Sequence, residues 1–234
     1  MVDTANLTLP LLDAAQAQKH VTMNEALARI DALGFAAVAS VGSSVPPVSI
    51  DGETHVVGQG ATGAWTGRDL EIAIAQNGGW EFFAPRAGWQ VWSLTDHVFL
   101  VFDGAAWQGG AVAVSSGGAA TVQEVMEFDQ TLSGSVATST EVIPDKASVL
   151  GITARVVEVI AGATDWSLGV SSDPTRYGAG FGTALNSAAE GVTGQPVTYY
   201  GGEPVEITAN GGSFTAGRLR IAVHFQAVRA PRAV

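Results

Sequence analysis

The sequence predicts a mainly β protein with one short helix near its N-terminus. Glycine is abundant, with 29 residues, while only 14% of residues are charged, a composition typical of many short strands joined by tight turns. The apolar content of 47% is sufficient for a packed core. We therefore expect a short N-terminal helix, a small Trp-rich β-meander domain and a C-terminal jelly-roll-like β-sandwich.

Composition divides the chain of 234 residues into four segments. The helical spacing of apolar residues ends before residue 35, and strand-like patterns follow it. The stretch GGAVAVSSGGAAT is small and nearly uncharged, which favours a flexible joint. The predicted segments are an N-terminal anchor segment and helix (1–34), a Trp-rich β-meander domain (35–108), a linker (109–121) and a β-sandwich (122–234).

The N-terminal helix is predicted to begin at about Met23. Thr22 and Glu25 have the spacing of a capping box, and Gly34 is placed to end the helix in the left-handed conformation. About three turns are too few to be stable alone, so the apolar stripe and leader need a partner surface. That surface is either the chain's own sheet or the same helix in neighbouring subunits. The predicted anchor and oligomerisation residues are Leu9, Leu11, Leu12, Met23, Leu27, Ile30 and Leu33.

Short strands separated by turn residues follow the helix from residue 53 to residue 107, which predicts a β-meander. Asn77-Gly78 is the strongest hairpin signal in the chain. Before it, Leu70, Ile72 and Ile74 alternate with Glu71 and Ala73, and together with the hairpin this alternation predicts the register of the strand.

Five of the six tryptophans lie in or beside this meander. A small domain needs large rings to supply buried area, so core packing is the favoured interpretation. The alternative is a flat aromatic platform that stacks on sugar rings, for which the candidates are Trp80, Trp89 and Trp92.

Two long strands are predicted at the centre of the C-terminal sandwich, at residues 149–160 and 218–228. Their apolar faces consist of Leu150, Ile152, Ala154, Val156 and Ile160 in the first strand and Leu219, Ile221, Val223, Phe225 and Ala227 in the second. Shorter strands are expected at 167–170, 197–200 and 205–209, and Gly-rich loops at 173–182, 188–196 and 210–217.

No catalytic residue, metal site or cofactor is predicted. The absence of cysteine excludes disulfides and thiolate metal sites, and no HExxH, P-loop or GxSxG motif occurs. The histidines are not at metal-ligand spacing and are interpreted as structural: His20, His55, His97 and His224. An acid pair for glycoside hydrolysis stays open, because a linear sequence does not give carboxyl separations. Its candidates are Asp129, Glu141, Asp145, Asp165 and Asp173.

Charge and hydropathy restrict the partners. The formal charge is −11 and no basic patch occurs, so nucleic acid is not an expected partner. No run approaches the roughly 18 apolar residues of a membrane span, so membrane insertion is not expected either.

The candidate ligand-binding residues are Arg176, Tyr177, Tyr199 and Tyr200. Tyrosine and arginine in Gly-rich loops suit a carbohydrate- or protein-binding tip, because ring faces stack and guanidinium groups bridge polar pairs. The competing interpretation is that the two consecutive tyrosines straddle a strand, one ring inward and one outward.

The stretches LPLLDAAQAQKHVTMNEALARIDAL and GATGAWTGRDLEIAIAQNGGWEFFAPRAGWQVW resemble the N-terminal domain of a family of alphaproteobacterial phage and gene-transfer-agent structural proteins. The resemblance covers residues 7–107. The later stretches VIPDKASVLGITARVVEVIAGATDWSLGV and YYGGEPVEITANGGSFTAGRLRIAVHF resemble the fibre-type ends attached to that domain. These proteins are tail-fibre or head-spike components, and their N-terminal domain has no assigned function.

The resemblance implies a non-enzymatic protein on the surface of a virion or gene-transfer-agent particle. We expect a tail fibre or spike that attaches to host surface polysaccharide, forms a homotrimer and contacts other tail, baseplate or capsid proteins. It would assemble in the host cytoplasm and leave by lysis. The alternatives are a stand-alone carbohydrate-binding module and a glycosidase acting on capsule.

Overall fold

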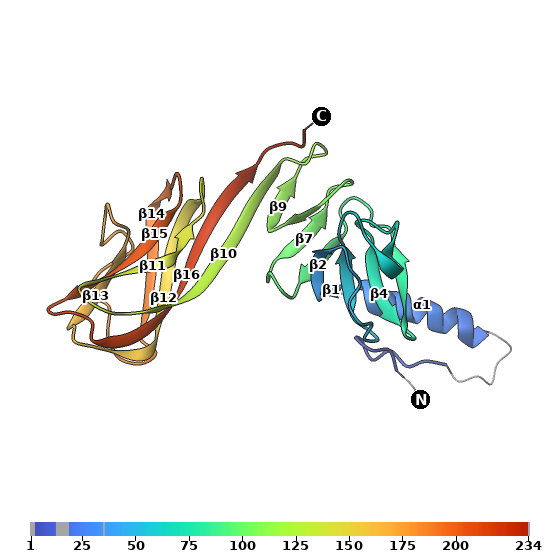
Figure 1. Cartoon of the computed structure of the whole chain (residues 1–234), viewed down its shortest axis with the longest axis horizontal. Coiled ribbons are helices and arrows are strands. Elements are labelled where there is room, and N and C mark those ends of the chain that lie inside the picture. The colour runs from blue at the N-terminus through green and yellow to red at the C-terminus, as the bar shows by residue number, and fades with distance from the viewer. Residues whose placement is uncertain (1–2, 13–18, 35, 234) are drawn as a thin grey trace. The chain divides into compact units, whose positions relative to one another are not determined.

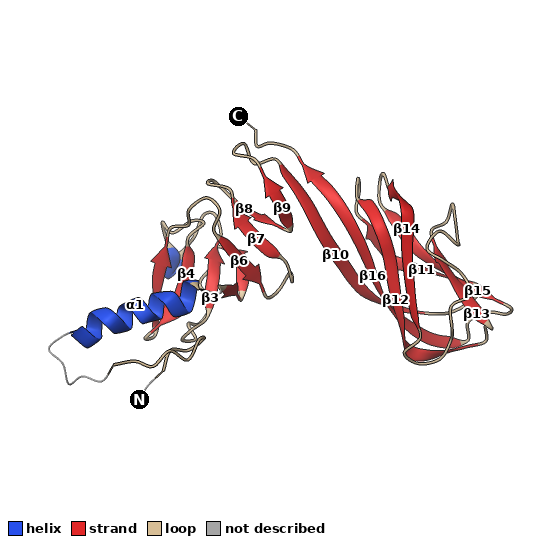
Figure 2. Cartoon of the chain, turned by 180° about the vertical axis from the view of Figure 1, so that it is seen from behind, coloured by secondary structure: helices blue, strands red, loops and turns tan. Residues whose placement is uncertain are grey.

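The computed structural model describes residues 3–12, 19–34 and 36–233. As predicted, the chain is mainly β, with several sheets and one short helix near the N-terminus (Figures 1 and 2). It divides into two compact units: unit 1 comprises Met1–Ala120 and Ala230–Val234, and unit 2 comprises Thr121–Arg229. Within the described ranges, no helix is long and apolar enough to cross a membrane.

Helix α1 spans Lys19–Leu33, so the predicted start at Met23 is wrong. Thr22 lies inside the helix and does not cap it. The capping-box spacing is also compatible with a helix interior, and packing against the chain extends a helix beyond its local signals. Asn24 contributes to this packing, because its side-chain amide pairs with the backbone of Leu12: Oδ1 accepts from the amide nitrogen (2.9 Å) and Nδ2 donates to the carbonyl oxygen (3.1 Å).

The helix ends at Leu33, as expected, but Gly34 does not adopt a left-handed conformation. A Cβ atom on Gly34 would lie 2.7 Å from the carbonyl oxygen of Ile30, so glycine is needed for close approach. The predicted apolar stripe is only partly covered: Leu27 and Leu33 are half-buried, while Met23 and Ile30 are exposed. Of the leader residues, Leu9 and Leu11 are half-buried and Leu12 is exposed.

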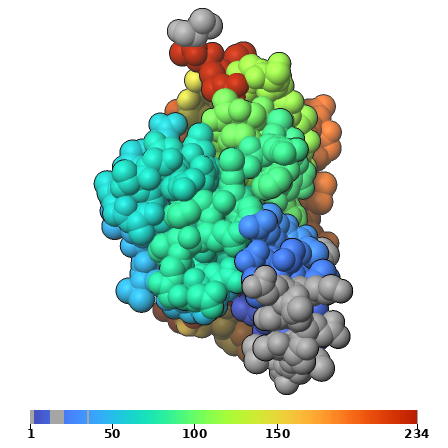
Figure 3. Space-filling view, turned by 90° about the vertical axis from the view of Figure 1, so that its right-hand side faces the viewer, coloured from blue at the N-terminus to red at the C-terminus, as the bar shows by residue number. Residues whose placement is uncertain are grey.

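Asp31 holds the N-terminal segment against the helix. Its buried carboxylate accepts hydrogen bonds from the Thr4 hydroxyl (2.7 Å), from the Leu7 backbone amide and from both amides of Asn6. Burial alone would raise the pKa of this carboxyl, but the four hydrogen bonds outweigh it and lower the pKa below its ordinary value. Figure 3 shows the blue atoms of the N-terminal part of unit 1 next to the green atoms of its later strands.

Replacing Asp31 with asparagine should destabilise unit 1 by about 1–3 kcal/mol at neutral pH, because the new NH2 group would face existing donors. The wild-type advantage should be full above the unfolded pKa of about 3.9 and should disappear as the pH falls through the lower folded pKa. Urea unfolding between pH 2 and 7 measures this dependence. Asp3→Asn, an exposed change in the same segment, is the control, and equal stability of the two variants would contradict the assignment.

Unit 1 contains two four-stranded sheets, where the sequence predicts one meander. One sheet has the order β1-β6-β7-β8 and the other β2-β3-β4-β5. Each combines a three-strand antiparallel meander with one strand in parallel. A short 3-10 helix, η1 (Gly63–Trp65), joins β3 to β4. The strands are β1 (Ala37–Val38), β2 (Ser40–Ser43), β3 (Thr54–Val57), β4 (Ile72–Gln76), β5 (Gly79–Phe83), β6 (Gln90–Ser93), β7 (Phe99–Phe102) and β8 (Trp107–Gly109).

The predicted Asn77-Gly78 hairpin is confirmed. Both residues have positive φ, 52° and 72°, between β4 and β5, as a type I′ turn requires. In β4, Ile72 and Ile74 pack in one core and Ala73 packs in another, so this strand is covered on both faces. Leu70 lies before the strand and is half-buried.

Residues 109–121, expected as a linker, contain strand β9 (Ala111–Val114). The chain also returns to unit 1 after Arg229. There Arg232 donates to the Asp103 carboxylate (2.6 Å) and to the Ser116 carbonyl oxygen (2.9 Å). Burial would raise the pKa of Asp103, but hydrogen bonds from Gln108 and two backbone amides, together with Arg232, lower it.

Unit 2 is a two-sheet sandwich with jelly-roll connectivity. Strands β14, β12, β16 and β10 are neighbours in that order in one sheet, and β11, β15 and β13 form the other. Each successive strand from β10 to β16 therefore lies in the opposite sheet, which is the pattern of a jelly roll with seven strands. The strands are β10 (Ala120–Thr131), β11 (Val136–Ile143), β12 (Ser148–Ala161), β13 (Asp165–Gly169), β14 (Ala188–Thr198), β15 (Glu203–Asn210) and β16 (Ala216–Arg229).

The two long central strands are confirmed as β12 and β16. The inward face of β16 is as predicted for Leu219 to Phe225, but the predicted face of β12 is wrong at Leu150. A bulge between Val149 and Gly151 makes Val149 the buried residue and leaves Leu150 half-buried. Residues 188–196, expected as a loop, belong to β14.

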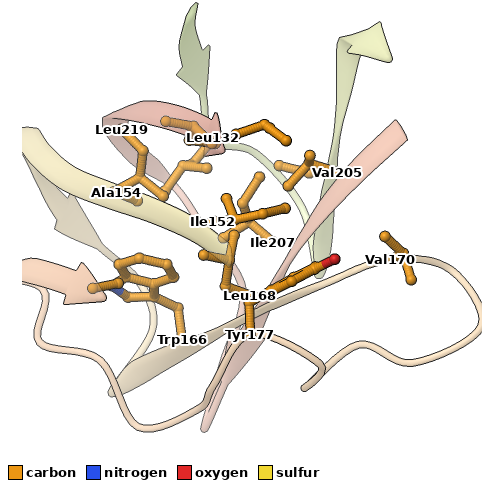
Figure 4. Packing of buried hydrophobic residues seen from close by; sticks show 14 of the residues in the cluster. Leu132, Ile152, Ala154, Trp166, Leu168, Val170, Tyr177, Val205, Ile207 and Leu219 are labelled. Carbon is orange, nitrogen blue, oxygen red and sulfur yellow. The ribbon is translucent and has the colours of Figure 1, made fainter. Parts of the chain in front are cut away.

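The Gly-rich loop 173–182 closes the edge of β13, where an eighth jelly-roll strand would lie. Backbone hydrogen bonds join Leu168 to Tyr177 and Trp166 to Phe181. Tyr177 and Trp166 are buried among the residues of the sandwich core (Figure 4). This loop is therefore part of the packed structure of unit 2.

Candidate functional site

The four loop residues predicted to bind a ligand have different environments. Tyr177 is 2% exposed, and its hydroxyl lies 2.9 Å from that of half-buried Tyr199. Burial, followed by this hydrogen bond, raises the pKa of Tyr177. Arg176 donates to the Gln195 carbonyl oxygen at 2.9 Å. Tyr177 therefore belongs to the core, because its loop replaces a strand, whereas the ring of Tyr200 is 76% exposed.

The alternative tryptophan platform is not flat. Trp80 packs against Trp65 in an edge-to-face arrangement with ring centroids 5.1 Å apart, and Trp89 packs against the other core of unit 1. Trp92 lies directly opposite the 60%-exposed Phe99, with centroids 4.8 Å apart. These positions agree with the core-packing interpretation for Trp80 and Trp89 and leave Trp92 beside an exposed ring.

Tyr200 borders a hollow of about 370 Å³ on the sheet that contains β14, β12 and β16. We call it the tyrosine hollow. Its floor is a row of polar residues on three neighbouring strands: Ser148 of β12 lies opposite Thr198 of β14 on one side and opposite Gln226 of β16 on the other. The residues of the tyrosine hollow used below are Thr121, Lys146, Ser148, Thr198, Tyr200 and Gln226.

The row lies on the outward face of the sheet. Along β16, Phe225 points into the core, so Gln226 points out. Directly opposite residues of paired strands share a face, so Ser148 and Thr198 point outward too. The tyrosine hollow thus combines an exposed ring, hydroxyl groups, an amide and an ammonium group. Such a set can stack on a sugar ring and exchange hydrogen bonds with its hydroxyls.

The sequence analysis found Tyr200 but missed the other residues of the tyrosine hollow. The signal available was the alternation of β16, which places Gln226 on the polar face. Pairing of Ser148 with both neighbours depends on the register of β12, β14 and β16. Because β14 was expected to be mostly loop, this row could not be assembled from the sequence.

Ion pairs occupy the same sheet further along the strands. Arg220 binds Asp129 with two hydrogen bonds, from Nε (2.8 Å) and Nη2 (3.1 Å). These bonds lower the pKa of the Asp129 carboxyl and raise that of Arg220. Arg218 pairs with Glu158 at 2.9 Å, and His224 Nε2 lies 3.1 Å from the Thr153 hydroxyl.

No group of three His, Asp or Glu residues among the described residues could hold a metal ion. His55 is buried, with its Nδ1 2.9 Å from the Ser40 hydroxyl. Desolvation lowers its pKa, against the opposing effect of Glu53. His97 lies beside Trp92, and the side chain of His20 lies outside the described part of the chain.

Residues 23–108 match a family described as a protein of unknown function (DUF2793). This match falls within unit 1 and overlaps the stretch that resembles phage and gene-transfer-agent proteins. It assigns no function, and it covers less than half of the chain. No curated protein matches.

Two solved structures are similar to parts of the chain. One is a cyanophage capsid asymmetric unit, at 24% identity over 47% of this chain and 84% of the matched chain, with a TM-score of 0.33. The other comes from Bacillus endospore appendages described as disulfide-linked pili, at 17% identity over 49% of this chain and 96% of the matched chain, with a TM-score of 0.23. With TM-scores this low, neither similarity supports a statement about function.

Proposed function

We propose that the chain is a structural protein of a phage or gene-transfer-agent particle, a tail fibre or spike that binds host surface polysaccharide through unit 2. The tyrosine hollow carries this proposal, because it places an exposed aromatic ring beside outward hydroxyl and amide groups. The resemblance of residues 7–107 supplies the particle context. The proposal assigns no reaction to the chain.

A shallow site of this kind suits a repeating polymer. One stacked ring and a few hydrogen bonds give weak binding. Several copies of the site on a homotrimer, the proposed state, would bind a polymer of identical repeats firmly through multivalency. Contacts with other tail, baseplate or capsid proteins would then belong to unit 1, which carries the resemblance.

Replacing Tyr200 with alanine should weaken binding to polysaccharide purified from the host surface by about fivefold, since an aromatic contact is worth about 1 kcal/mol. Tyr200→Phe keeps the ring and should bind like the wild type. Isothermal titration calorimetry on the full chain measures both, and thermal melting checks folding. Wild-type affinity in a folded Tyr200→Ala variant would remove the tyrosine hollow from the proposal.

Electron cryo-microscopy of the particle tests the structural role separately. We expect density for the chain on the tail or head surface. A chain absent from particles but able to bind polysaccharide would be a stand-alone carbohydrate-binding module. Release of reducing sugar from purified capsule would instead identify a glycosidase.

The exposed side of α1 is the proposed oligomerisation face. Met23 and Ile30 are 49% and 55% exposed and seven residues apart, the spacing of one coiled-coil heptad. Deleting residues 1–34 would not test this face, because Ala32 is part of the core of unit 1.

Replacing Met23 and Ile30 together with lysine should convert the oligomer to monomers without lowering the melting temperature, because both side chains are exposed in the single chain. Light scattering measures the mass. Val48→Lys, a change at an 86%-exposed residue of unit 1, is the control and should leave the mass unchanged. A monomeric wild type, or an unchanged mass in the double variant, would contradict the proposed face.

A further inference from the structure

A second hollow, with a volume of about 440 Å³, lies on the same sheet of β14, β12 and β16. We call it the arginine hollow. Thr153 of β12 and Ala222 of β16 are directly opposite each other, and these two short side chains leave a depression between longer charged ones. The residues of the arginine hollow used here are Glu127, Thr153, Arg155, Glu190, Arg220 and Ala222.

Two arginines border the arginine hollow as a directly opposed pair. Arg155 and Arg220 are register partners in the two central strands, and like charges in this position destabilise a sheet. Arg220 is compensated by Asp129 at 2.8 Å and by Glu127 at 3.8 Å. Arg155 has no carboxylate in ion-pair range among the described residues, and its Nη1 donates to the Asn186 carbonyl oxygen at 2.8 Å.

Hydrogen bonds to Asp129 and to the Asn186 carbonyl oxygen therefore orient the guanidinium groups of Arg220 and Arg155 without a ligand. Each guanidinium has five N–H donors. The hydrogen bonds to Asp129 use two donors of Arg220, and the bond to Asn186 uses one donor of Arg155. The remaining donors suit a carboxylate, which accepts paired hydrogen bonds from arginine. Uncompensated charge on Arg155 adds attraction for an anion.

The acidic residues of the arginine hollow narrow the choice of anion. Glu127 and Glu190 would repel a compact multivalent anion such as phosphate, but their carboxylates accept hydrogen bonds from sugar hydroxyls. A neutral sugar would leave the charge of Arg155 without a partner. A ligand with one carboxylate and several hydroxyls satisfies both kinds of residue, and this is the chemistry of a uronic acid.

The two hollows lie on the same outward face. Ala222 and Gln226 are four residues apart on β16 and both point away from the core, a separation of about 13 Å along a strand. We propose that the arginine hollow binds a uronic acid residue of the same polysaccharide that occupies the tyrosine hollow. This inference rests on the proposed function and adds to it an acidic polymer as the ligand class.

Galacturonic acid oligosaccharides and the same oligosaccharides with their carboxyl groups reduced to neutral galactose are the probes. In calorimetry on the full chain, we expect the wild type to bind the acidic probe at least tenfold more tightly than the neutral one. Arg155→Gln should remove this preference, because it should weaken binding of the acidic probe to the level of the neutral one. Arg218→Gln, on the same strand face but outside the arginine hollow, is the matched control and should keep the preference.

Ala222→Leu provides a second test, because it fills the arginine hollow without changing any charge, and it should weaken binding of the acidic probe. Equal wild-type affinity for both probes, or a preference retained in both folded variants, would overturn the uronic acid assignment. The proposed function would survive that result if Tyr200→Ala still lowered binding to host polysaccharide. If Tyr200→Ala bound host polysaccharide like the wild type, while the wild type still preferred the acidic probe, the tyrosine hollow would not be a binding site. The uronic acid assignment of the arginine hollow would then still stand.

Discussion

Replacing Trp166 with alanine should destabilise unit 2 by about 3–5 kcal/mol, the usual cost of removing a buried tryptophan side chain. Trp166 is fully buried, and its ring lies 4.8 Å from that of Phe181. Its Nε1 donates to the Gly182 carbonyl oxygen at 3.0 Å. The variant would therefore lose core volume and the tie between β13 and loop 173–182.

Trp166 is the only tryptophan of unit 2, since the other five lie in unit 1. Circular dichroism should follow the unfolding of unit 2, and tryptophan fluorescence of the variant reports unit 1 alone. Trp166→Phe keeps a ring and should lose less stability. A loss below about 1 kcal/mol for the alanine variant would mean that Trp166 is not a central core residue.

Strands of this chain could be predicted where apolar and polar residues alternate, so that only one face of the strand is apolar. β16 alternates between Leu219, Ile221 and Val223 on the inside and polar residues on the outside, and both its position and its inward face were predicted correctly. β14 could not be recognised, because three of the four residues from 193 to 196 are threonine, glycine and proline. Such residues favour loops, and only pairing with β12 makes this segment a strand.

Tertiary contacts also decided which tyrosine faces solvent. The local sequence predicts the same exposed, ligand-binding role for Tyr177 and Tyr200, because both lie beside glycine-rich stretches. Tyr177 is buried because loop 173–182 replaces a jelly-roll strand, and this is a property of the whole topology. The tyrosine and arginine hollows depend on register across β12, β14 and β16, and register is not encoded in one strand alone.

Replacing Gly191 with alanine should destabilise unit 2 by about 1–3 kcal/mol and release loop 173–182. Gly191 is buried on β14, opposite Ile152. A Cβ atom there would lie 2.3 Å from the Tyr177 carbonyl oxygen and 2.8 Å from that of Ile152. Both are backbone atoms, so the clash cannot be relieved by rotating a side chain.

Gly194→Ala is the matched control, because it lies on the same strand with no atom within 4 Å of an added Cβ, and it should leave stability unchanged. Release of the loop would also expose the bond after Arg176, so trypsin should cleave there faster in Gly191→Ala than in the control. Thermal melting and the rate of this cleavage measure the two effects. If Gly191→Ala resisted trypsin like the wild type, loop 173–182 would not depend on its contact with β14. If it melted early but stayed resistant, the strain would instead fall on the pairing of β14 with β12, because Ile152 is the other backbone neighbour of the new Cβ.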